Sequence, residues 1–117
     1  MQAKPTHHTP FYVLELAIRA IEILRPVVER IRRHDRDLAD QLQRSLTSSP
    51  LNIAEGNRSR GGTRLARFST AAGSNGESRA ALRVAVAWRY VLAQDIAEGD
   101  QVLDRVAAML HKLGAKL

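Results

Sequence analysis

The 117 residues are enough for one domain with a single hydrophobic core, and too few for a catalytic domain with a separate binding domain. The chain has no cysteine, which excludes disulfides and thiolate metal sites. Its apolar stretches are too short for a standard signal peptide or a membrane span, so we expect a cytoplasmic protein. The net charge of +6 at pH 7 suggests an anionic partner.

The positive excess is concentrated in one segment of the chain. Residues 57–92 contain seven Lys or Arg against one acidic residue, whereas residues 1–56 contain eight against seven. Residues 93–117 contain three against four. An anionic partner is therefore expected to bind the segment that follows Gly56.

The composition favours helices, because aromatic residues make up only 4% of the chain while Ala, Leu, Arg and Glu are plentiful. The first helix is predicted to begin at Pro10, with Thr9 as its cap, and to end near residues 33–34. Pro26 should kink or break it. Its core-facing stripe contains Phe11, Leu14, Ile18, Ile21, Leu24, Val28 and Ile31.

The second helix is predicted to follow Asp35 or Asp37, either of which can cap it. Pro50 lies inside the helical pattern, where a proline costs roughly 3 kcal/mol. The helix therefore either ends near Ser48 or continues with a kink to Gly56. We favour the continuation, because apolar residues keep helical spacing across the proline.

The third helix is predicted over residues 64–93, after a turn at residues 56–62. Gly61 and Gly62 can adopt positive φ in that turn, and Thr63 can cap the helix that follows. The middle of this helix is weak in helix propensity, because it contains two glycines.

The second and third helices are expected to pack as a hairpin. In that arrangement residues 45–49 lie opposite residues 71–75, so that small residues face small residues. This register gives Gly73 a packing role, and Gly76 shares it as the second glycine of the segment.

The fourth helix has the most regular stripe of the chain. Asp95 and Glu98 can form a capping box at its start, although Gly99 and Asp100 offer a later one, and Gly114 is a natural terminator. Its apolar stripe follows heptad spacing with Gly99 at the one vacant place: Ile96, Leu103, Val106, Leu110, Leu113 and Leu117. Four amphipathic helices with short connections predict an all-α, up-down-up-down four-helix bundle. The bundle domain covers residues 10–117 and follows a disordered tail at residues 1–9.

A sequence motif around the second and third helices resembles the bacterial four-helix bundle family named for 23S rRNA intervening sequences. It consists of Ser48, Asn52, Ile53, Ala54, Glu55, Gly56 and Arg58, followed by Gly73, Ser74 and Glu77, and by Met109 and Leu110 in the last helix. The resemblance implies a cytoplasmic homo-oligomer, most simply a pentameric ring, with no established catalytic activity. Related accessory proteins of diversity-generating retroelements look like partners of nucleic acids and reverse transcriptases. The chain departs from the family in having Asn75 and Ser78 where leucines are usual.

An anion-binding surface is the sharpest functional hypothesis. Arginines surround a flexible turn that leads into a helix N-terminus, whose free N–H groups and dipole favour phosphate. They are Arg58, Arg60, Arg64 and Arg67, and Arg79 and Arg83 could extend the surface. The alternative is a solvated arginine surface that keeps the protein soluble. Trp88 and Tyr90 lie far from the turn in sequence, which argues against base stacking there.

Asn52, Glu55 and Glu77 form a second candidate site, because two carboxylates can perform acid–base chemistry. We favour a structural interpretation, in which the carboxylates pair with arginines such as Arg58 and Asn52 satisfies the carbonyl freed by Pro50. A di-iron centre would require Glu-x-x-His pairs, which the sequence lacks, and Gly61-Gly62 lacks the Walker pattern. No metal or other cofactor is predicted.

The sequence thus predicts a non-enzymatic, self-associating bundle that presents the residue 58–67 surface to RNA, DNA or a nucleic-acid enzyme. The main alternative is a purely protein-binding oligomeric scaffold without a nucleic-acid role, and an enzyme using Glu55 and Glu77 is a weaker one. Self-association is also expected from apolar residues outside the core stripe of the third helix, namely Val84, Trp88 and Val91.

Overall fold

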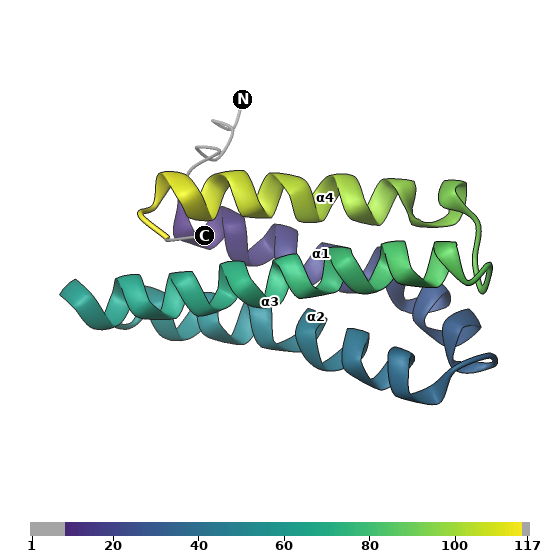
Figure 1. Ribbon diagram of the computed structural model, residues 1–117. Coiled ribbons are helices and arrows are strands. Elements are labelled where there is room, and N and C mark those ends of the chain that lie inside the picture. The colour runs from purple at the N-terminus through teal and green to yellow at the C-terminus, as the bar shows by residue number, and fades with distance from the viewer. Residues whose placement is uncertain (1–8, 116–117) are drawn as a thin grey trace, which may run out of the picture.

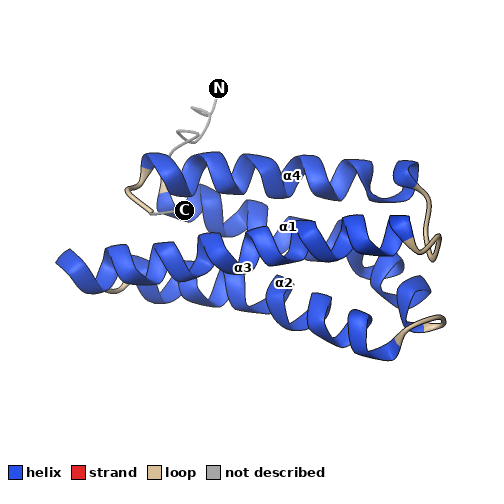
Figure 2. Cartoon of the chain, in the orientation of Figure 1, coloured by secondary structure: helices blue, strands red, loops and turns tan. Residues whose placement is uncertain are grey.

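Four helices make up the chain over residues 9–115, which the computed structural model describes (Figures 1 and 2). They are α1 (Pro10–Arg32), α2 (Arg36–Asn57), α3 (Gly61–Ala87) and α4 (Ala93–Lys112). The described residues contain no strand. Helices adjacent in sequence pack against one another, and α1 also packs against α4. The predicted all-α four-helix bundle is confirmed.

The described part of the chain contains no helix long and apolar enough to cross a membrane. Most of the predicted N-terminal tail, and Leu117 of the predicted α4 stripe, lie outside the described residues.

Side-chain caps start the first two helices as the sequence predicts. The Thr9 Oγ1 accepts a hydrogen bond from the backbone N–H of Tyr12 at 3.1 Å, and Pro10 occupies the first turn of α1. The Asp35 Oδ1 accepts one from the N–H of Leu38 at 3.0 Å. Pro26 does not break α1, because the helix runs without interruption to Arg32.

α2 continues through Pro50 and ends at Asn57, one residue beyond the predicted Gly56, so the favoured continuation across the proline is confirmed. The predicted kink at Pro50 stays a prediction. The role predicted for Asn52 is wrong in its partner. Its Nδ2 donates to the carbonyl oxygen of Ser48 at 2.9 Å, whereas the carbonyl left without an amide by Pro50 is that of Leu46. Asn52 lies on the same helix face as Ser48, one turn later, so its side chain reaches the Ser48 carbonyl oxygen and not that of Leu46.

The predicted start of α3 is too late by three residues. α3 begins at Gly61, which has a φ of 58°, and Arg60 precedes it without a side-chain cap. Thr63 therefore lies inside the first turn and does not cap the helix. Only Gly61 of the two turn glycines uses the left-handed region.

The predicted end of α3 is too late by six residues. α3 stops at Ala87, and Val91 then turns inward and is only 4% exposed in the core. α4 begins at Ala93, and the Asp95 carboxylate accepts a hydrogen bond from the Leu92 N–H at 2.8 Å. Asp95 thus stabilises the start of α4 from inside its first turn and is not the cap residue itself.

Small polar residues join α2 to α3 close to the predicted register, since Ser48 faces Ser74 within the predicted segments and Ser45 faces Ser78 just beyond them. The hydroxyls of Ser45 and Ser78 lie 2.7 Å apart, and those of Ser48 and Ser74 lie 2.8 Å apart. Gly73 and Gly76 are exposed, and a Cβ on either would meet no atom within 4 Å. The packing role predicted for these glycines is therefore wrong, because the buried face in this part of α3 is formed by other residues, namely Ala71, Ala72, Asn75 and Ser78.

The core consists of two clusters of buried side chains along the bundle. One contains Leu24, Leu42, Leu82 and Leu103, and the other contains Val13, Ile53, Phe68, Val106 and Leu110. Gly99 lies where the α4 stripe has its vacancy, and the Leu24 side chain occupies the position that a Gly99 Cβ would take. Gly114 ends α4 with a φ of 100°, as predicted.

Candidate nucleic-acid interface

The turn between α2 and α3, residues 58–60, forms one tip of the molecule, at the left of Figure 1. Arg58 is the C-cap of α2 and Arg60 precedes α3, and both side chains are exposed. Arg67 is also exposed, and its Nη1 lies 3.4 Å from the Asn52 Oδ1. We call Arg58, Arg60 and Arg67 the arginine tip.

Arg64 has a structural role that the sequence did not indicate. Its Nη1 donates to the carbonyl oxygen of Gly56 at 3.3 Å, and its guanidinium lies 4.8 Å from the centre of the Phe68 ring. The side chain therefore joins the end of α2 to the first turns of α3 through a hydrogen bond and a cation–π contact. Arg64 is half-buried, so less of its charge faces solvent than in the arginine tip.

Gly56 allows α2 and α3 to approach closely beside Arg64. A Cβ at Gly56 would lie 2.5 Å from the Cε1 of Phe68, which is fully buried. The motif glycine therefore holds the Phe68 ring against the α2 backbone.

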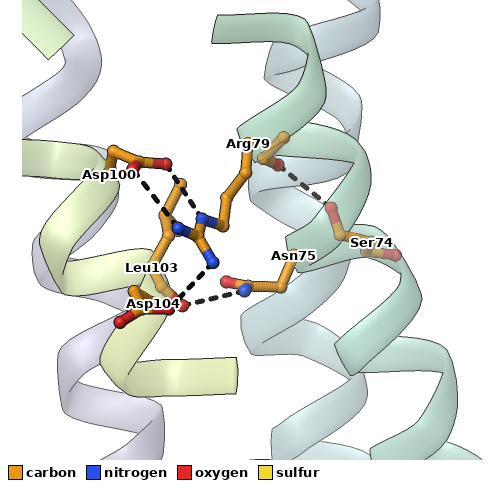
Figure 3. A network of polar contacts seen from close by, with 7 residues as sticks. Ser74, Asn75, Arg79, Asp100, Leu103 and Asp104 are labelled. Atoms are coloured by element: carbon orange, nitrogen blue, oxygen red, sulfur yellow. Dashed lines mark hydrogen bonds and ion pairs between the residues drawn. The ribbon is translucent and has the colours of Figure 1, made fainter. Parts of the chain in front are cut away.

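Arg79 is neutralised by two carboxylates of α4 (Figure 3). Its Nε lies 2.9 Å from the Asp100 Oδ1, and its Nη1 lies 3.0 Å from the Asp104 Oδ1. The hydrogen bond to Asp100 raises the pKa of Arg79 above its usual value, and the charges of both aspartates act in the same direction. Arg79 is therefore unsuited to phosphate binding, although the sequence grouped it with the arginine surface. Arg83, one turn further along α3, is exposed.

Asn75 lies beside this ion pair and is 1% exposed (Figure 3). Its Nδ2 donates to the carbonyl oxygen of Leu103 at 2.9 Å, which ties α3 to α4. Its Oδ1 is buried without a hydrogen-bond partner. Ser78, one turn further along α3, bonds to Ser45, so buried polar side chains link α3 to both neighbouring helices.

The remaining motif residues divide into two groups. Ser48, Asn52 and Ser74 form one hydrogen-bonded set, with the Asn52 Nδ2 3.1 Å from the Ser48 Oγ. Glu55 and Glu77 are exposed, as is Gly73, and neither carboxylate forms an ion pair within residues 9–115. The predicted pairing of these acids with arginines is therefore wrong, because both carboxylates face solvent.

The apolar residues expected outside the core divide as well. Val84 is 43% exposed and Trp88 is 67% exposed, as predicted, whereas Val91 is buried. His34 and His111 are exposed near helix ends. Among the described residues, no three His, Asp or Glu side chains come together as metal ligands would.

Residues 13–112 match the model of the 23S rRNA-intervening sequence protein family. The chain belongs to this family. A structure of similar fold comes from Bacteroides thetaiotaomicron, a protein of unknown function from the S23 ribosomal protein family. The two share 15% sequence identity with a TM-score of 0.77, over 86% of this chain and 96% of the other. No curated protein matches the sequence.

Proposed function

We propose that this member of the 23S rRNA-intervening sequence family is a non-enzymatic, self-associating bundle whose arginine tip binds RNA or DNA phosphates. The observation that carries the proposal is the position of Arg58, Arg60 and Arg67. All three are exposed around the first turns of α3. Arg60 is the N-cap residue of that helix, and its side chain forms no capping hydrogen bond. The free N–H groups and the helix dipole add to the attraction of a phosphate.

The family description names an intervening sequence of 23S rRNA, which makes RNA the first nucleic acid to test. The arginine tip contributes charge and backbone donors, so its contacts suit the phosphate backbone more than the bases. A nucleic-acid enzyme is the other partner that we propose for this surface.

Substitution of Arg58, Arg60 and Arg67 by alanine together is expected to reduce the salt dependence of RNA binding. Each lost phosphate contact should lower the slope of log K against log salt by about 0.7 for a single strand, or about 0.9 for a duplex. Filter binding across a salt series measures this slope. A matched control replaces Arg19, Arg25 and Arg44, which are exposed elsewhere and carry the same charge.

Equal slopes for the two triple variants would place the phosphate contacts outside the arginine tip. Binding to an acidic protein without any RNA or DNA binding at low salt would favour the protein-binding scaffold instead.

Self-association is supported by large apolar side chains that the single chain leaves exposed. Leu51 is 61% exposed on α2, and Val84 is 43% exposed on α3. Sedimentation velocity is expected to show a species several times heavier than the 13.0 kDa chain. If the exposed face of α2 is the interface, Leu51→Glu should dissociate the assembly, and if that of α3 is, Val84→Glu should. In either case the assembly would have to bury a charge, which is unfavourable. A single 13.0 kDa species for the unaltered chain would contradict self-association.

A further inference from the structure

The end of the bundle opposite the arginine tip holds three near-parallel aromatic rings. The His34 and Tyr90 ring centres lie 5.1 Å apart with an interplanar angle of 8°, and those of Trp88 and Tyr90 lie 6.4 Å apart at 17°. Both pairs fall within the range of offset stacking. Trp88 is 67% exposed, so the set of rings ends in an open indole.

Tyr90 is held in place by the surrounding turns. Its hydroxyl donates to the Asp35 Oδ2 at 3.4 Å, and Asp35 itself caps α2. Partial desolvation raises the pKa of the Tyr90 phenol, and Asp35 acts in the same direction, so the hydroxyl remains a donor at neutral pH. The rings are thus positioned before any ligand arrives.

A pocket of about 360 Å³ lies beside these rings, between the α1–α2 and α3–α4 turns. Three arginines line it. Arg30 is paired with Asp95 at 2.9 Å. Arg33 and Arg89 are exposed and form no ion pair within the described part of the chain. Two uncompensated guanidiniums therefore face a pocket next to an open aromatic surface.

Arg89 occupies a backbone position that normally favours glycine. Its φ is 63°, and the Tyr90 N–H bonds to the Ala85 carbonyl while the Arg89 N–H bonds to that of Val86. This is a Schellman motif, in which glycine is the usual residue. The same motif ends α4, where Gly114 holds the equivalent place. Strain of this kind is concentrated at functional sites, so an arginine here points to a role for its side chain.

We propose that this end of the bundle binds single-stranded nucleic acid, with a base stacked on Trp88 and the flanking phosphates on Arg33 and Arg89. Bases stack on aromatic rings regardless of sequence, and only an unpaired strand offers a free base face. A second copy of this chain is the competing occupant of Trp88, since Val84 lies one helical turn away and is also exposed. A two-fold contact would bring the guanidiniums of both copies together, and the concentration dependence of Trp88 emission tests any other contact between copies. The site is separate from the arginine tip and does not depend on it.

Trp88 is the single tryptophan of the chain, so intrinsic fluorescence reports on this site alone. Short oligo(U) and oligo(dT) strands are expected to quench it saturably at low salt, and the comparison separates RNA from DNA as the better ligand. An abasic strand of equal length, which supplies phosphates without bases, should not quench it. The control variant Arg67→Ala, altered only at the arginine tip, should leave the quenching midpoint unchanged.

Single substitutions measure the contribution of each side chain to binding at this site. In anisotropy titrations with a labelled strand, Trp88→Ala should weaken binding about tenfold, whereas Trp88→Phe should retain most of the affinity. Arg33→Ala should lower the salt slope by about 0.7. Arg89→Gly should also weaken binding, yet leave the thermal midpoint unchanged or higher, because glycine removes the strain. A purely structural Arg89 would not separate affinity from stability in this way.

Equal quenching by the abasic strand, or no quenching by any strand, would overturn the proposal. A Trp88 emission shift that follows protein concentration alone would also overturn it, because a second copy would then cover the indole. An unchanged salt slope in the arginine-tip triple variant, with saturable quenching retained, would support this site while removing the proposed function of the arginine tip.

Discussion

Asn75→Asp is expected to lower the free energy of unfolding by roughly 3–5 kcal/mol at neutral pH, because it places an uncompensated charge in the core. Asn75 is 1% exposed, and its Nδ2 is the donor to the Leu103 carbonyl. A carboxylate in the same space loses that donor and faces the carbonyl oxygen with its own negative charge, and the neighbouring Arg79 is already paired with Asp100 and Asp104. Urea unfolding of the variant and the unaltered chain measures the difference.

The loss at Asn75 should depend on pH with a definite sign. Burial raises the pKa of a carboxyl in the folded state above its value in the unfolded chain. Stability is then retained below the unfolded pKa and lost as the pH rises through the folded one. The control Gln101→Glu makes the same chemical change at an exposed position of α4 and should have little effect. Equal stability of the two variants at neutral pH would contradict the role assigned to Asn75.

Gly99→Ala is expected to destabilise the protein by about 1–2 kcal/mol, because the overpacking of a filled core outweighs the gain in helix propensity. The added Cβ would overlap the Leu24 side chain, which is fully buried and cannot move into solvent. The control Gly73→Ala meets no atom within 4 Å and should stabilise α3 by up to about 1 kcal/mol. Thermal or urea unfolding distinguishes the two signs.

A double variant tests whether the Gly99 effect comes from Leu24. Leu24→Ala alone should cost about 2–5 kcal/mol through the cavity that it leaves. Gly99→Ala added to that background should restore stability, because the new methyl group enters the cavity. If Gly99→Ala destabilises both backgrounds equally, the overlap with Leu24 is not the cause.

The two proposed sites use different chemistry at opposite ends of the bundle. The arginine tip offers guanidiniums and the N-terminus of α3. The Trp88 end offers open ring surface and two arginines. A strand that contacted both would be held by its phosphates at one end and by a base at the other, which is how sequence-tolerant binders combine charge with stacking.

Local sequence signals predicted much of the fold. The Thr9 and Asp35 caps, the helix through Pro50 and the terminator Gly114 were all readable, because each depends on residues within one helical turn. The ends of α3 were not. Residues 88–93 are compatible with a helix, and α3 stops before them because Val91 is buried in a core built from all four helices.

The candidate sites were predictable to different degrees. Arg58, Arg60 and Arg67 were found from sequence, because they lie close together around one turn. The neutralisation of Arg79 was not, because its partners Asp100 and Asp104 are more than 20 residues away. The stacking of His34 on Tyr90 was missed for the same reason, since two turns far apart in sequence meet only in the folded bundle.

The sequence alone therefore determined the helix class, the number of helices and the concentration of positive charge after Gly56. These features follow from residue composition and short-range periodicity, which act before the chain has folded. The tertiary structure decided which arginines remain uncompensated, which glycines lie under a neighbouring side chain, and which rings stack. Each of these depends on the register between helices, and that register is set by the packing of buried side chains from different parts of the chain.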